Sequence, residues 1–494
     1  MLLKLITEIY YITSVLLRIF LLIVWMSCSV GTKSQSPELY GLTRFGGVLE
    51  LGSLYKINGN GTGYTTLFAC DTANYSANGY DARENIFWAS NNKIYGMFYG
   101  GGSQTLFGLS AGTLFSFDPA TNTFTKIIDL GPAIGGLPVF NGFNEYNGKL
   151  YASLVAGGAY NSGTLISIDL ATNQVTNLHD FNGHDGSYPY GTLTFGDDGY
   201  FYGVCSTEGS TNSLGNPFGG GSIYQFNPRD NTLLKVFSFL DDAVNSIYTS
   251  TNPIAAPLYY HHRLYGVTTT SSGPFVNGAF YCYNLDNDSF YVVNAYSVFH
   301  NSQGYGVPLL VGDSIYVVID DGVAVFDPAT SVFSLRYSFT GFSSASPTAG
   351  LIQASDGNLY GTLSGEGINN GSIYKIDLHR DSIFELFSFD GTDGFEPIGT
   401  LVEKRRFNGI PSPTATSSFI RVSQSPGKVD GWQIETSDDY SGQAFTIYDL
   451  HLRQIASSRF NGTSTRVQQD VPPGIYFLRT QGGTEAVTVK LLKE

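Results

Sequence analysis

Short apolar runs separated by glycine-rich turns repeat along most of the chain. A tripeptide of an apolar residue, a Tyr and a small residue begins at Leu39, Ile94, Leu150, Phe201, Leu264, Ile315 and Leu359. Successive copies lie 55, 56, 51, 63, 51 and 44 residues apart. Such self-similarity at a fixed period is the mark of a repeat architecture, and it predicts seven similar units.

The polar positions divide each unit into four predicted strands. A second strand of the form Gly-small-apolar-x-x-apolar-Asp/Asn follows each tripeptide, as at residues 112–118 and 371–377. The turn at 118–122, Asp-Pro-Ala-Thr-Asn, has the Asp and Pro that a type I turn prefers. A third strand such as 233–239 follows, then a Gly/Pro-rich loop, as at 181–189. The fourth strand, as at 350–354, leads through an Asp-Gly hairpin into the next tripeptide.

Four short antiparallel strands in about 50 residues are typical of a β-propeller blade. The fold class predicted is all-β: a seven-bladed β-propeller over residues 39–403, followed by a small Ig-like β-sandwich. The last unit ends in an extra strand, 398–403, and the first unit lacks the strand that opens the others. We therefore expect 398–403 to complete the blade that begins at Leu39, which closes the ring. An open solenoid of seven sheets is the alternative.

The Leu-Tyr-Gly-Thr motif at 359–362 and the Phe-Ser-Phe-Asp-Gly-Thr-Asp-Gly-Phe-Glu-Pro motif at 387–397 resemble the Gly-rich tandem repeats called GloVer in bacterial surface proteins. The resemblance covers residues 39–403. It is specific at 350–400 and blurred at 204–310, where insertions intervene. It implies a propeller-like repeat protein at the cell exterior, and it carries no agreed activity or catalytic set.

The N-terminus has the pattern of an export signal over residues 1–31. Lys4 precedes an apolar run at 12–24 that only Arg18 interrupts, and small residues follow at 27–29 and at 31. This order of charged start, apolar middle and small-residue exit predicts a cleaved signal peptide. Two alternatives remain: a permanent transmembrane anchor over 5–26, and lipid attachment at Cys28, whose preceding residues make a poor lipobox.

The composition changes after residue 403. A basic cluster and a Pro/Ser/Thr-rich stretch form a predicted linker at 404–417, and residues 418–494 show a new strand pattern without the Leu-Tyr-Gly motif. Strands are expected at 432–434, 444–448, 465–467, 474–478 and 486–492, which suits a small β-sandwich.

This C-terminal part resembles the type A sorting domain of the Bacteroidetes type IX secretion system. The matching residues are Ile447, Tyr448 and Asp449, then Gly474, Ile475 and Tyr476, and finally Lys490 in the terminal strand. The family's Tyr-Pro-Asn-Pro entry is replaced by Val-Ser-Gln-Ser-Pro at 422–426, and the Gly expected after Asp449 is absent. The resemblance implies export by the type IX machinery, cleavage in the linker by a sortase-like peptidase, and release or lipopolysaccharide anchoring. A plain Ig-like binding domain is the alternative.

The charge and cysteine content of the chain limit the classes of partner that it can bind. Charged residues make up 14% of the chain, and the formal net charge is −15. An acidic surface repels phosphate backbones, so nucleic-acid binding is disfavoured. Contact with a membrane is expected only in transit during export. Three cysteines, Cys70, Cys205 and Cys282, remain after the signal, so at least one thiol is free, and the latter two are expected to be inert core residues.

Candidate chemistry is sparse. The sequence holds no HExxH, GxSxG, P-loop or dinucleotide fingerprint and no cysteine/histidine set with metal-ligand spacing, so we predict no catalytic set, cofactor or metal. The Asp185 and Asp393 loops have two interpretations, Ca²⁺ or sugar binding and ordinary turn chemistry, of which the second is favoured. His261 and His262 are expected in a solvated hairpin turn.

Two functions from different classes remain open. The first is a surface binding module that grips a glycan or another extracellular ligand through loops on one rim. The second is a secreted polysaccharide-degrading hydrolase or lyase, because propellers also carry such enzymes. Convergence of His, Asp, Glu, Arg and Tyr in the central funnel favours the enzyme, and aromatic side chains along an open rim favour the binding module.

Overall fold

The structure is a computed structural model in which two compact units, Met1–Arg405 and Arg406–Glu494, separate by their contacts. The residues described are 36–46, 51–70, 75–139, 141–207, 220–239, 241–242, 247–248, 250–268, 270–271, 278–295, 306–342, 346–347, 349–365, 370–392, 394–404, 420–424, 431–436, 444–449, 454–459, 464–468, 474–481 and 488–493. The predicted signal peptide, most of the linker, and Asp393 lie outside them.

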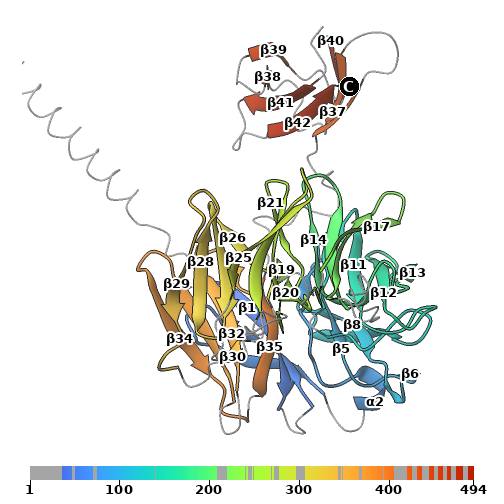
Figure 1. Cartoon of the computed structure of the whole chain (residues 1–494), viewed down its shortest axis with the longest axis vertical. Helices are drawn as coiled ribbons and strands as arrows, with labels where there is room; N and C mark the ends of the chain where they lie inside the picture. Colours follow the sequence, from blue (N-terminus) through green and yellow to red (C-terminus); the bar gives the residue numbers. More distant parts are fainter. Residues whose placement is uncertain are drawn as a thin grey trace, which may run out of the picture. The chain divides into compact units, whose positions relative to one another are not determined.

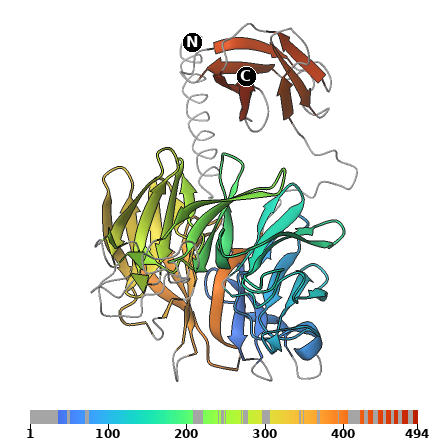
Figure 2. The same cartoon turned by 45° about the vertical axis from the view of Figure 1, so that its right-hand side comes forward.

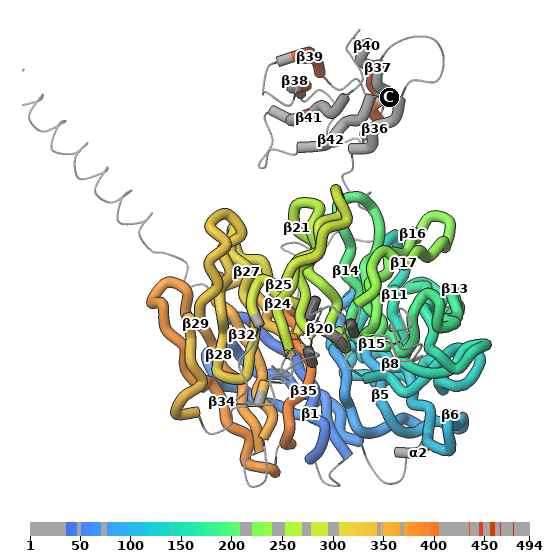
Figure 3. Tube along the Cα trace, viewed as in Figure 1, coloured from blue at the N-terminus to red at the C-terminus, as the bar shows by residue number. Residues whose placement is uncertain are grey.

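The first unit is a propeller of seven blades within the described residues. Each blade is an antiparallel sheet whose strands pair in a simple meander, and the sheets follow one another in chain order around a ring (Figures 1 and 3). Blades one to four comprise β35 (Phe395–Glu403), β1 (Glu38–Phe45), β2 (Ser53–Asn58) and β3 (Thr65–Ala69); β4 (Phe87–Trp88), β5 (Ile94–Phe98), β8 (Thr113–Asp118) and β9 (Thr123–Asp129); β10 (Asn144–Tyr146), β11 (Lys149–Leu154), β12 (Thr164–Asp169) and β13 (Val175–Asp180); and β14 (Ser187–Phe195), β15 (Phe201–Thr207), β16 (Ser222–Asn227) and β17 (Thr232–Ser238).

The later blades follow the same plan, except that the first strand of blade seven is in two pieces that both pair with its second strand. Blades five to seven comprise β21 (Leu258–Tyr260), β22 (Arg263–Thr268), β24 (Ala279–Asn284) and β25 (Ser289–Ala295); β26 (Leu309–Val311), β27 (Ser314–Ile319), β28 (Gly322–Asp327) and β29 (Val332–Ser338); and β30 (Ser346–Pro347), β31 (Ile352–Gln353), β32 (Leu359–Ser364), β33 (Ser372–Asp377) and β34 (Ser382–Ser388). Connecting segments hold α2 (Tyr75–Asn78), β6 (Thr105–Leu106), β7 (Leu109–Ser110), β18 (Asp241–Asp242), β19 (Ile247–Tyr248), β20 (Ser250–Thr251) and β23 (Thr270–Ser271).

The predicted ring closure is confirmed. Strand β35 pairs antiparallel with β1, with Leu39 opposite Glu403 and Leu42 opposite Ile398, and Figure 2 shows the orange strand beside the blue one. The backbone N–H of Lys404 donates to the carbonyl of Glu38 at 2.9 Å. The first blade is therefore built from both ends of the propeller sequence, which rules out an open solenoid.

The Tyr of the repeated tripeptide is a packing residue in six of the seven blades: Tyr40, Tyr95, Tyr151, Tyr202, Tyr265 and Tyr360 are at most 4% exposed. These rings pack toward the following blade. The Tyr40 and Trp88 rings meet edge to face at 5.1 Å, and Tyr202 stacks on Tyr259 at 5.6 Å. The expectation that these tyrosines serve the core is confirmed for these six.

The small residue of the tripeptide makes room for an aromatic ring of the neighbouring strand. In blade seven, a Cβ added to Gly361 would lie 2.4 Å from the hydroxyl oxygen of Tyr374, which stands directly opposite it in the sheet. Phe339 from the preceding blade meets the Tyr374 ring edge to face at 4.9 Å. The same Gly–Tyr–Phe contact recurs as Gly41–Tyr55–Phe389, Gly203–Tyr224–Phe181 and Gly266–Tyr281–Phe239. Three sequence motifs that lie far apart in the chain are thus parts of one interface between blades.

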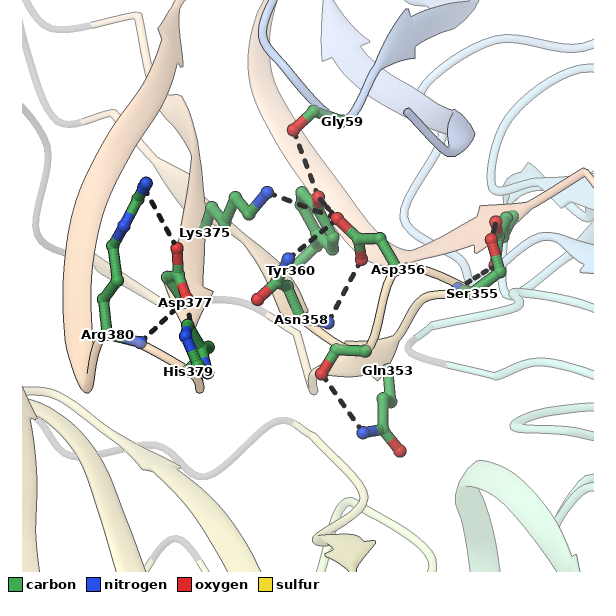
Figure 4. Close-up of polar contacts among 12 residues, drawn as sticks. Gly59, Gln353, Ser355, Asp356, Asn358, Tyr360, Lys375, Asp377, His379 and Arg380 are labelled. Atoms are coloured by element: carbon green, nitrogen blue, oxygen red, sulfur yellow. Dashed lines mark hydrogen bonds and ion pairs between the residues drawn. The ribbon is translucent and has the colours of Figure 1, made fainter. Parts of the chain in front are cut away.

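One rim of the ring, here called the hairpin rim, carries the connections between first and second and between third and fourth strands. In blade seven the hydroxyl of Tyr360 donates to Asp356 Oδ2 at 2.8 Å, and Lys375 Nζ lies 3.2 Å from the same oxygen (Figure 4). Tyr360 also reaches the carbonyl of Gly59 in blade one at 3.1 Å. The Asp of the Asp-Gly hairpin therefore holds the tripeptide Tyr in place.

The Asp-Pro-Ala-Thr turns close one residue later than a type I turn. Asn173 adopts a left-handed conformation with φ 58°, and its N–H donates to the carbonyl of Asp169 at 2.8 Å. The Asp169 carboxylate accepts the N–H groups of Ala171 and Thr172. An Asn tolerates the left-handed region well, so the sequence at this rim agrees with its backbone.

The predicted Gly/Pro-rich loop at 181–189 is wrong at its end. Ser187 and Pro189 already belong to β14, where they pair with Thr207 and Cys205. A Pro is acceptable here because β14 is an edge strand of its sheet, where a missing N–H need not interrupt the ladder. The register shifts only further along the strand, between Tyr190 and Thr194.

The second unit contains two antiparallel sheets in its described part, ordered β36-β37-β40 and β39-β38-β41-β42. The strands are β36 (Ile420–Gln424), β37 (Gly431–Thr436), β38 (Ala444–Asp449), β39 (Gln454–Arg459), β40 (Ser464–Gln468), β41 (Gly474–Gln481) and β42 (Thr488–Lys493). Five of them were expected from the sequence, and β36 and β39 were not. The Ig-like sandwich itself stays a prediction.

Candidate functional site

The opposite rim, here called the loop rim, carries the connections between second and third strands and between blades. Five residues with a Cβ adopt a left-handed conformation at the same point, just before the first strand of a blade or at its second residue. They are Asp81, Leu137, Tyr188, Asn252 and Glu396, with φ between 51° and 60°. Leu, Tyr and Glu are uncommon in this region of φ, so something in the structure must hold them there.

A backbone hydrogen bond to the preceding blade holds each of these residues. The N–H of Tyr188 donates to the carbonyl of Ser162 at 2.8 Å, and that of Glu396 donates to Asn370 at 2.8 Å. The remaining bonds run from Leu137 to Ala111, from Asn252 to Gly220 and from Asp81 to Leu51. In four blades a Pro follows and packs against a glycine of the preceding blade. Each arrangement, here called a blade clasp, fixes the backbone of the loop rim.

Two of the clasp residues belong to a charged and aromatic cluster where blades one and two meet. Arg44 donates from Nε to Asp81 Oδ1 at 2.9 Å and from Nη1 to Glu396 Oε2 at 3.2 Å. Arg83 donates from Nε and Nη2 to Asp81 Oδ2 at 2.9 and 2.6 Å. The four side chains are 12–30% exposed, so they are neither on the open surface nor in the core.

Aromatic rings lie beside both guanidinium groups of this cluster. The Arg83 guanidinium lies 4.0 Å from the centre of the Tyr99 ring, and the Arg44 guanidinium lies 4.6 Å from that of Phe45. Phe45 in turn stacks on Phe395 with ring centres 5.4 Å apart. We call Arg44, Asp81, Arg83, Glu396 and these three rings the arginine–aromatic cluster. Planar polar groups held flat beside rings present fixed donors, acceptors and an apolar face.

Glu84 follows Arg83 in the chain and is fully buried. Neither of its carboxyl oxygens makes a hydrogen bond to the described residues. Burial raises the pKa of Glu84 well above its usual range, while the Asn141 backbone and the Arg83 charge oppose that shift. Its neighbour Asn85 joins the innermost parts of three blades: Nδ2 donates to the carbonyl of Asn141 at 3.1 Å, and Oδ1 accepts the N–H of Thr400 at 2.6 Å. Glu84 is therefore a buried carboxyl with a raised pKa next to the innermost contacts of the ring.

The sequence analysis missed this cluster. The equivalent segments at 188–192 and 396–400 have Pro at the second position and Gly-Thr at the fourth and fifth, whereas 81–85 is Asp-Ala-Arg-Glu-Asn. That departure from the repeat was a signal in the sequence. The ion pair between Arg44 and Glu396 left no such signal in the sequence, because it depends on ring closure between residues 352 positions apart.

The other predicted candidates behave as turn or core residues. Asp185 Oδ2 lies 2.7 Å from His179 Nε2, and its Oδ1 accepts the N–H of Asn182. Burial raises the pKa of Asp185, but these bonds outweigh it and the net direction is downward. His261 and His262 are the two exposed central residues of a hairpin, with φ 51° and 55°, as expected. Cys70, Cys205 and Cys282 are buried, and the thiols of Cys205 and Cys282 are free.

Within the described residues, no cluster of three or more His, Cys, Asp or Glu side chains could hold a metal ion. Across that same part of the chain, no helix is long and apolar enough to cross a membrane, and the apolar N-terminal run lies outside it.

The residues of the predicted sorting motif come together in one sheet of the second unit. Ile447, Tyr448 and Asp449 are on β38, and Gly474, Ile475 and Tyr476 are on the adjacent β41, with Asp449 opposite Tyr476. Lys490 is on β42, opposite Phe477 of β41. Their role in sorting stays a prediction.

Comparison with solved structures finds similar chains at low sequence identity. One is the extracellular domain of a protein described as a one-component system from B. thetaiotaomicron, with 13% identity, TM-score 0.43 and coverage of 94% of this chain and 57% of that chain. A second is PorZ, a surface component of the type IX secretion system of Porphyromonas gingivalis, with 13% identity, TM-score 0.41 and coverage of 89% and 62%. A third, described as a 6-phosphogluconolactonase from Bacteroides uniformis, has 13% identity, TM-score 0.47 and coverage of 74% and 99%.

The chain thus spans about three fifths of the first two structures. At such identities, a shared fold says nothing about a shared activity. No curated protein matches the chain.

The sequence pattern of one family does match. The Gloeobacter/Verrucomicrobia repeat is found at residues 27–218 and 138–325, two overlapping ranges that begin ahead of the first blade and end in the sixth. The segment 350–400, where the sequence resemblance is clearest, lies beyond both ranges. Because the match covers more than half of the chain, this protein belongs to the Gloeobacter/Verrucomicrobia repeat family.

Proposed function

We propose that the protein is an exported binding module that grips an extracellular glycan at the loop rim of its propeller. The observation that carries this proposal is the arginine–aromatic cluster. Its donors and acceptors are held in place by each other, and its rings offer apolar faces beside them. A sugar presents the same combination of hydroxyl groups and apolar C–H faces, so the two surfaces are complementary.

The state of the carboxylates favours binding over catalysis. Asp81 is shared by two arginines, and Glu396 is paired with Arg44. A carboxylate occupied in this way is poorly placed to accept or deliver a proton, whereas it serves well to orient an arginine. The four charges also cancel, which suits an uncharged ligand.

A glycan array probed with the chain lacking residues 1–31 tests this proposal. We expect binding to be lost on Arg83→Ala and on Tyr99→Ala. Arg336→Ala is the matched control, because Arg336 makes a comparable two-bond pair with Asp381 and lies near Tyr337, away from the cluster. An array without any hit, or equal binding by the Arg83 and Arg336 variants, would contradict the proposal.

A polysaccharide-degrading enzyme is the second candidate, and Glu84 is the observation that favours it. A buried carboxyl whose pKa is raised well above its usual range has a property that general acids need. Release of reducing ends or unsaturated products from array-positive polysaccharides, abolished by Glu84→Gln, would establish this activity. Product release that survives Glu84→Gln would leave Glu84 without a catalytic role.

For the C-terminal unit we propose a type A sorting domain with a sandwich fold, which would direct export through the type IX machinery. Support comes from the motif residues themselves and from their order in the chain. Deleting residues 411–494 should leave the thermal stability of the propeller unchanged and hold the protein in the periplasm. Normal export without these residues would favour the plain binding domain instead.

A further inference from the structure

The connection between the second and third strands of blade two ends in a hairpin with an unusual tip. Strands β6 and β7 pair through Leu106 and Leu109, and the two residues between them, Phe107 and Gly108, have φ 53° and 80°. Both central residues of this tight turn are left-handed, a conformation that favours Asn or Asp followed by Gly. Phe is a poor choice for the first position, since its bulk disfavours positive φ.

Phe107 gains little from the fold in return. Its side chain is 64% exposed, and that of Leu109 is 52% exposed. A residue that breaks the local preference without being buried points to a role outside the fold.

The corresponding connection of blade three presents a second exposed ring. Tyr160 is 62% exposed and lies in the glycine-rich segment 156–163. The segment 131–137, which joins the two blades, contacts both connections. A Cβ on Gly131 would lie 2.8 Å from Gln104 Cβ on one side, and the Pro132 carbonyl accepts the Gly158 N–H at 2.8 Å on the other. We call Phe107, Leu109 and Tyr160, with segments 103–110, 131–137 and 156–163, the rim patch.

The rim patch contains no charged residue in any of its three segments, although the whole chain has a net charge of −15. Two carboxylates border the patch: Asp129 is taken up by Lys126 at 2.7 Å and by Ser103, and Asp180 Oδ1 accepts a hydrogen bond from Asn177 Nδ2 at 2.7 Å. The three segments themselves therefore offer a charged partner no opposite charge, and the bordering carboxylates are already hydrogen-bonded. The exposed rings stand apart from one another on polar loops, which also expose Gln104, Thr105 and Asn161. The rim patch is therefore not a continuous aliphatic face.

The rim patch and the arginine–aromatic cluster share one connection of the chain. Tyr99 of that cluster and Phe107 lie on the same connection of blade two, residues 99–112, and the Tyr99 N–H donates to the carbonyl of Asp81 at 3.1 Å. A chain-like ligand bound at the cluster can thus follow this connection outward.

From these observations we propose that the rim patch is a second subsite for a neutral polysaccharide, in which Phe107 and Tyr160 stack on the apolar faces of uncharged sugar rings. This inference rests on the proposed glycan-binding function and adds the chemical class of the ligand and the direction in which it extends. Leu109 supports the hairpin tip, and the loop amides and hydroxyls face the sugar hydroxyls.

Affinity gel electrophoresis of the chain lacking residues 1–31 tests the subsite. The probes are hydroxyethyl cellulose, xylan, mannan and laminarin as neutral polymers, alginate as an anionic polymer and chitosan as a cationic one. The double variant Phe107→Asn, Tyr160→Ser removes both rings. Asn suits the left-handed position, so this variant is expected to fold as well as the parent. Leu234→Ala, which removes a side chain 59% exposed on β17, is the matched control.

We expect retardation by at least one neutral polymer, weakened on the order of tenfold or more in the double variant and unchanged in the control. Retardation by a neutral polymer that the double variant retains would overturn the subsite and leave the proposed function standing. Retardation by alginate or chitosan alone would overturn the neutral ligand class. Retardation by no polymer, together with an array without hits, would overturn both proposals.

Further measurements on the same proteins test two other occupants of the rim patch, a second copy of this chain and a lipid surface. Self-association in light scattering, or binding to phosphatidylcholine vesicles, that the double variant abolishes would make the rim patch a docking surface of another kind. Either result without polymer retardation would overturn the subsite.

Discussion

The two rims of the propeller follow different rules. On the hairpin rim, left-handed positions are filled by residues that accept them, such as Asn122, Asn173 and Asn231 in the turns between third and fourth strands. On the loop rim, equivalent backbone strain falls on Leu137, Tyr188 and Glu396. The hairpin rim is thus optimised for folding, whereas the loop rim accepts strain and holds it with blade clasps. Backbone strain that the surrounding structure holds in place is often found at binding sites, which agrees with the proposed role of the loop rim.

The largest effect should come from forcing a blade clasp apart. Gly371 has φ 94°, and an added Cβ would lie 2.3 Å from Pro397 Cδ and 2.7 Å from the Leu363 carbonyl. We expect Gly371→Ala to destabilise the propeller by about 2–4 kcal/mol, measured by urea unfolding. The control is Gly357→Ala on the hairpin rim, where φ is 82° but no atom lies within 4 Å, so about 1 kcal/mol is expected. Equal losses would mean that backbone strain alone matters and that the clasp contributes nothing.

Glu84→Gln tests the buried carboxyl next to the ring's innermost contacts. Burial raises the pKa of Glu84 in the folded state, so the stability that its neutral form provides is complete below the unfolded value of 4.5. That stability is lost as the pH rises above this value, because only the unfolded state ionises readily. In thermal melts from pH 4 to pH 9, the melting temperature of the variant should therefore rise relative to that of the parent as the pH increases. A constant difference between them would show that Glu84 is not held neutral.

A reciprocal exchange sharpens the contrast between the rims. Tyr188→Asn places a residue that tolerates positive φ in a blade clasp, and it should stabilise the propeller by about 0.5–1 kcal/mol. Asn122→Tyr places the strained choice in an exposed turn of the hairpin rim and should destabilise by about 1 kcal/mol without affecting binding. Thermal melts and the array assay measure both. Opposite signs in stability are the essential result.

The smallest effect is expected at Arg336. Its ion pair with Asp381 is 51% and 55% exposed, so Arg336→Ala should cost less than about 1 kcal/mol and lose its effect in high salt. Arg83→Ala should cost about 1–3 kcal/mol, because it leaves the largely buried Asp81 with fewer hydrogen bonds. Urea unfolding at low and high salt compares the two. A larger loss at Arg336 would remove the distinction between a surface pair and the arginine–aromatic cluster.

The fold could be predicted from the sequence because its signals are local and repeated. Leu-Tyr-Gly marks one strand in each blade, and the missing strand ahead of Leu39 together with the surplus one at 398–403 predicted the closure. The segment 187–189 was assigned to a loop because Pro normally interrupts a ladder, and only the tertiary register shows how β14 accommodates it. The short strands β36 and β39 lack a repeat to reveal them.

The candidate site was far less predictable. Asp81, Arg83 and Glu84 looked like an irregular copy of the repeat, and their partners Arg44 and Glu396 come from opposite ends of the propeller sequence. Exposure of Phe107 is likewise a property of the folded hairpin: in the sequence, Thr-Leu-Phe-Gly-Leu-Ser has the same pattern as a buried strand. The hydrophobic pattern of a sequence predicts where strands lie. It does not predict which loops are exposed once the blades form a ring.

The pairing of β1 with β35 also sets an order of events. The residues of β1 are synthesised early, but the strand that covers one side of them is synthesised more than 350 residues later. Until residue 403 is available, the first blade has an unpaired edge, and the contacts that span the ring cannot form. The nascent chain must therefore remain open, or be kept so by other factors, throughout its synthesis and any transport that precedes folding. Ring closure removes the unpaired strand edge and so stabilises the finished propeller. It is also the slow step of folding, during which that edge stays exposed.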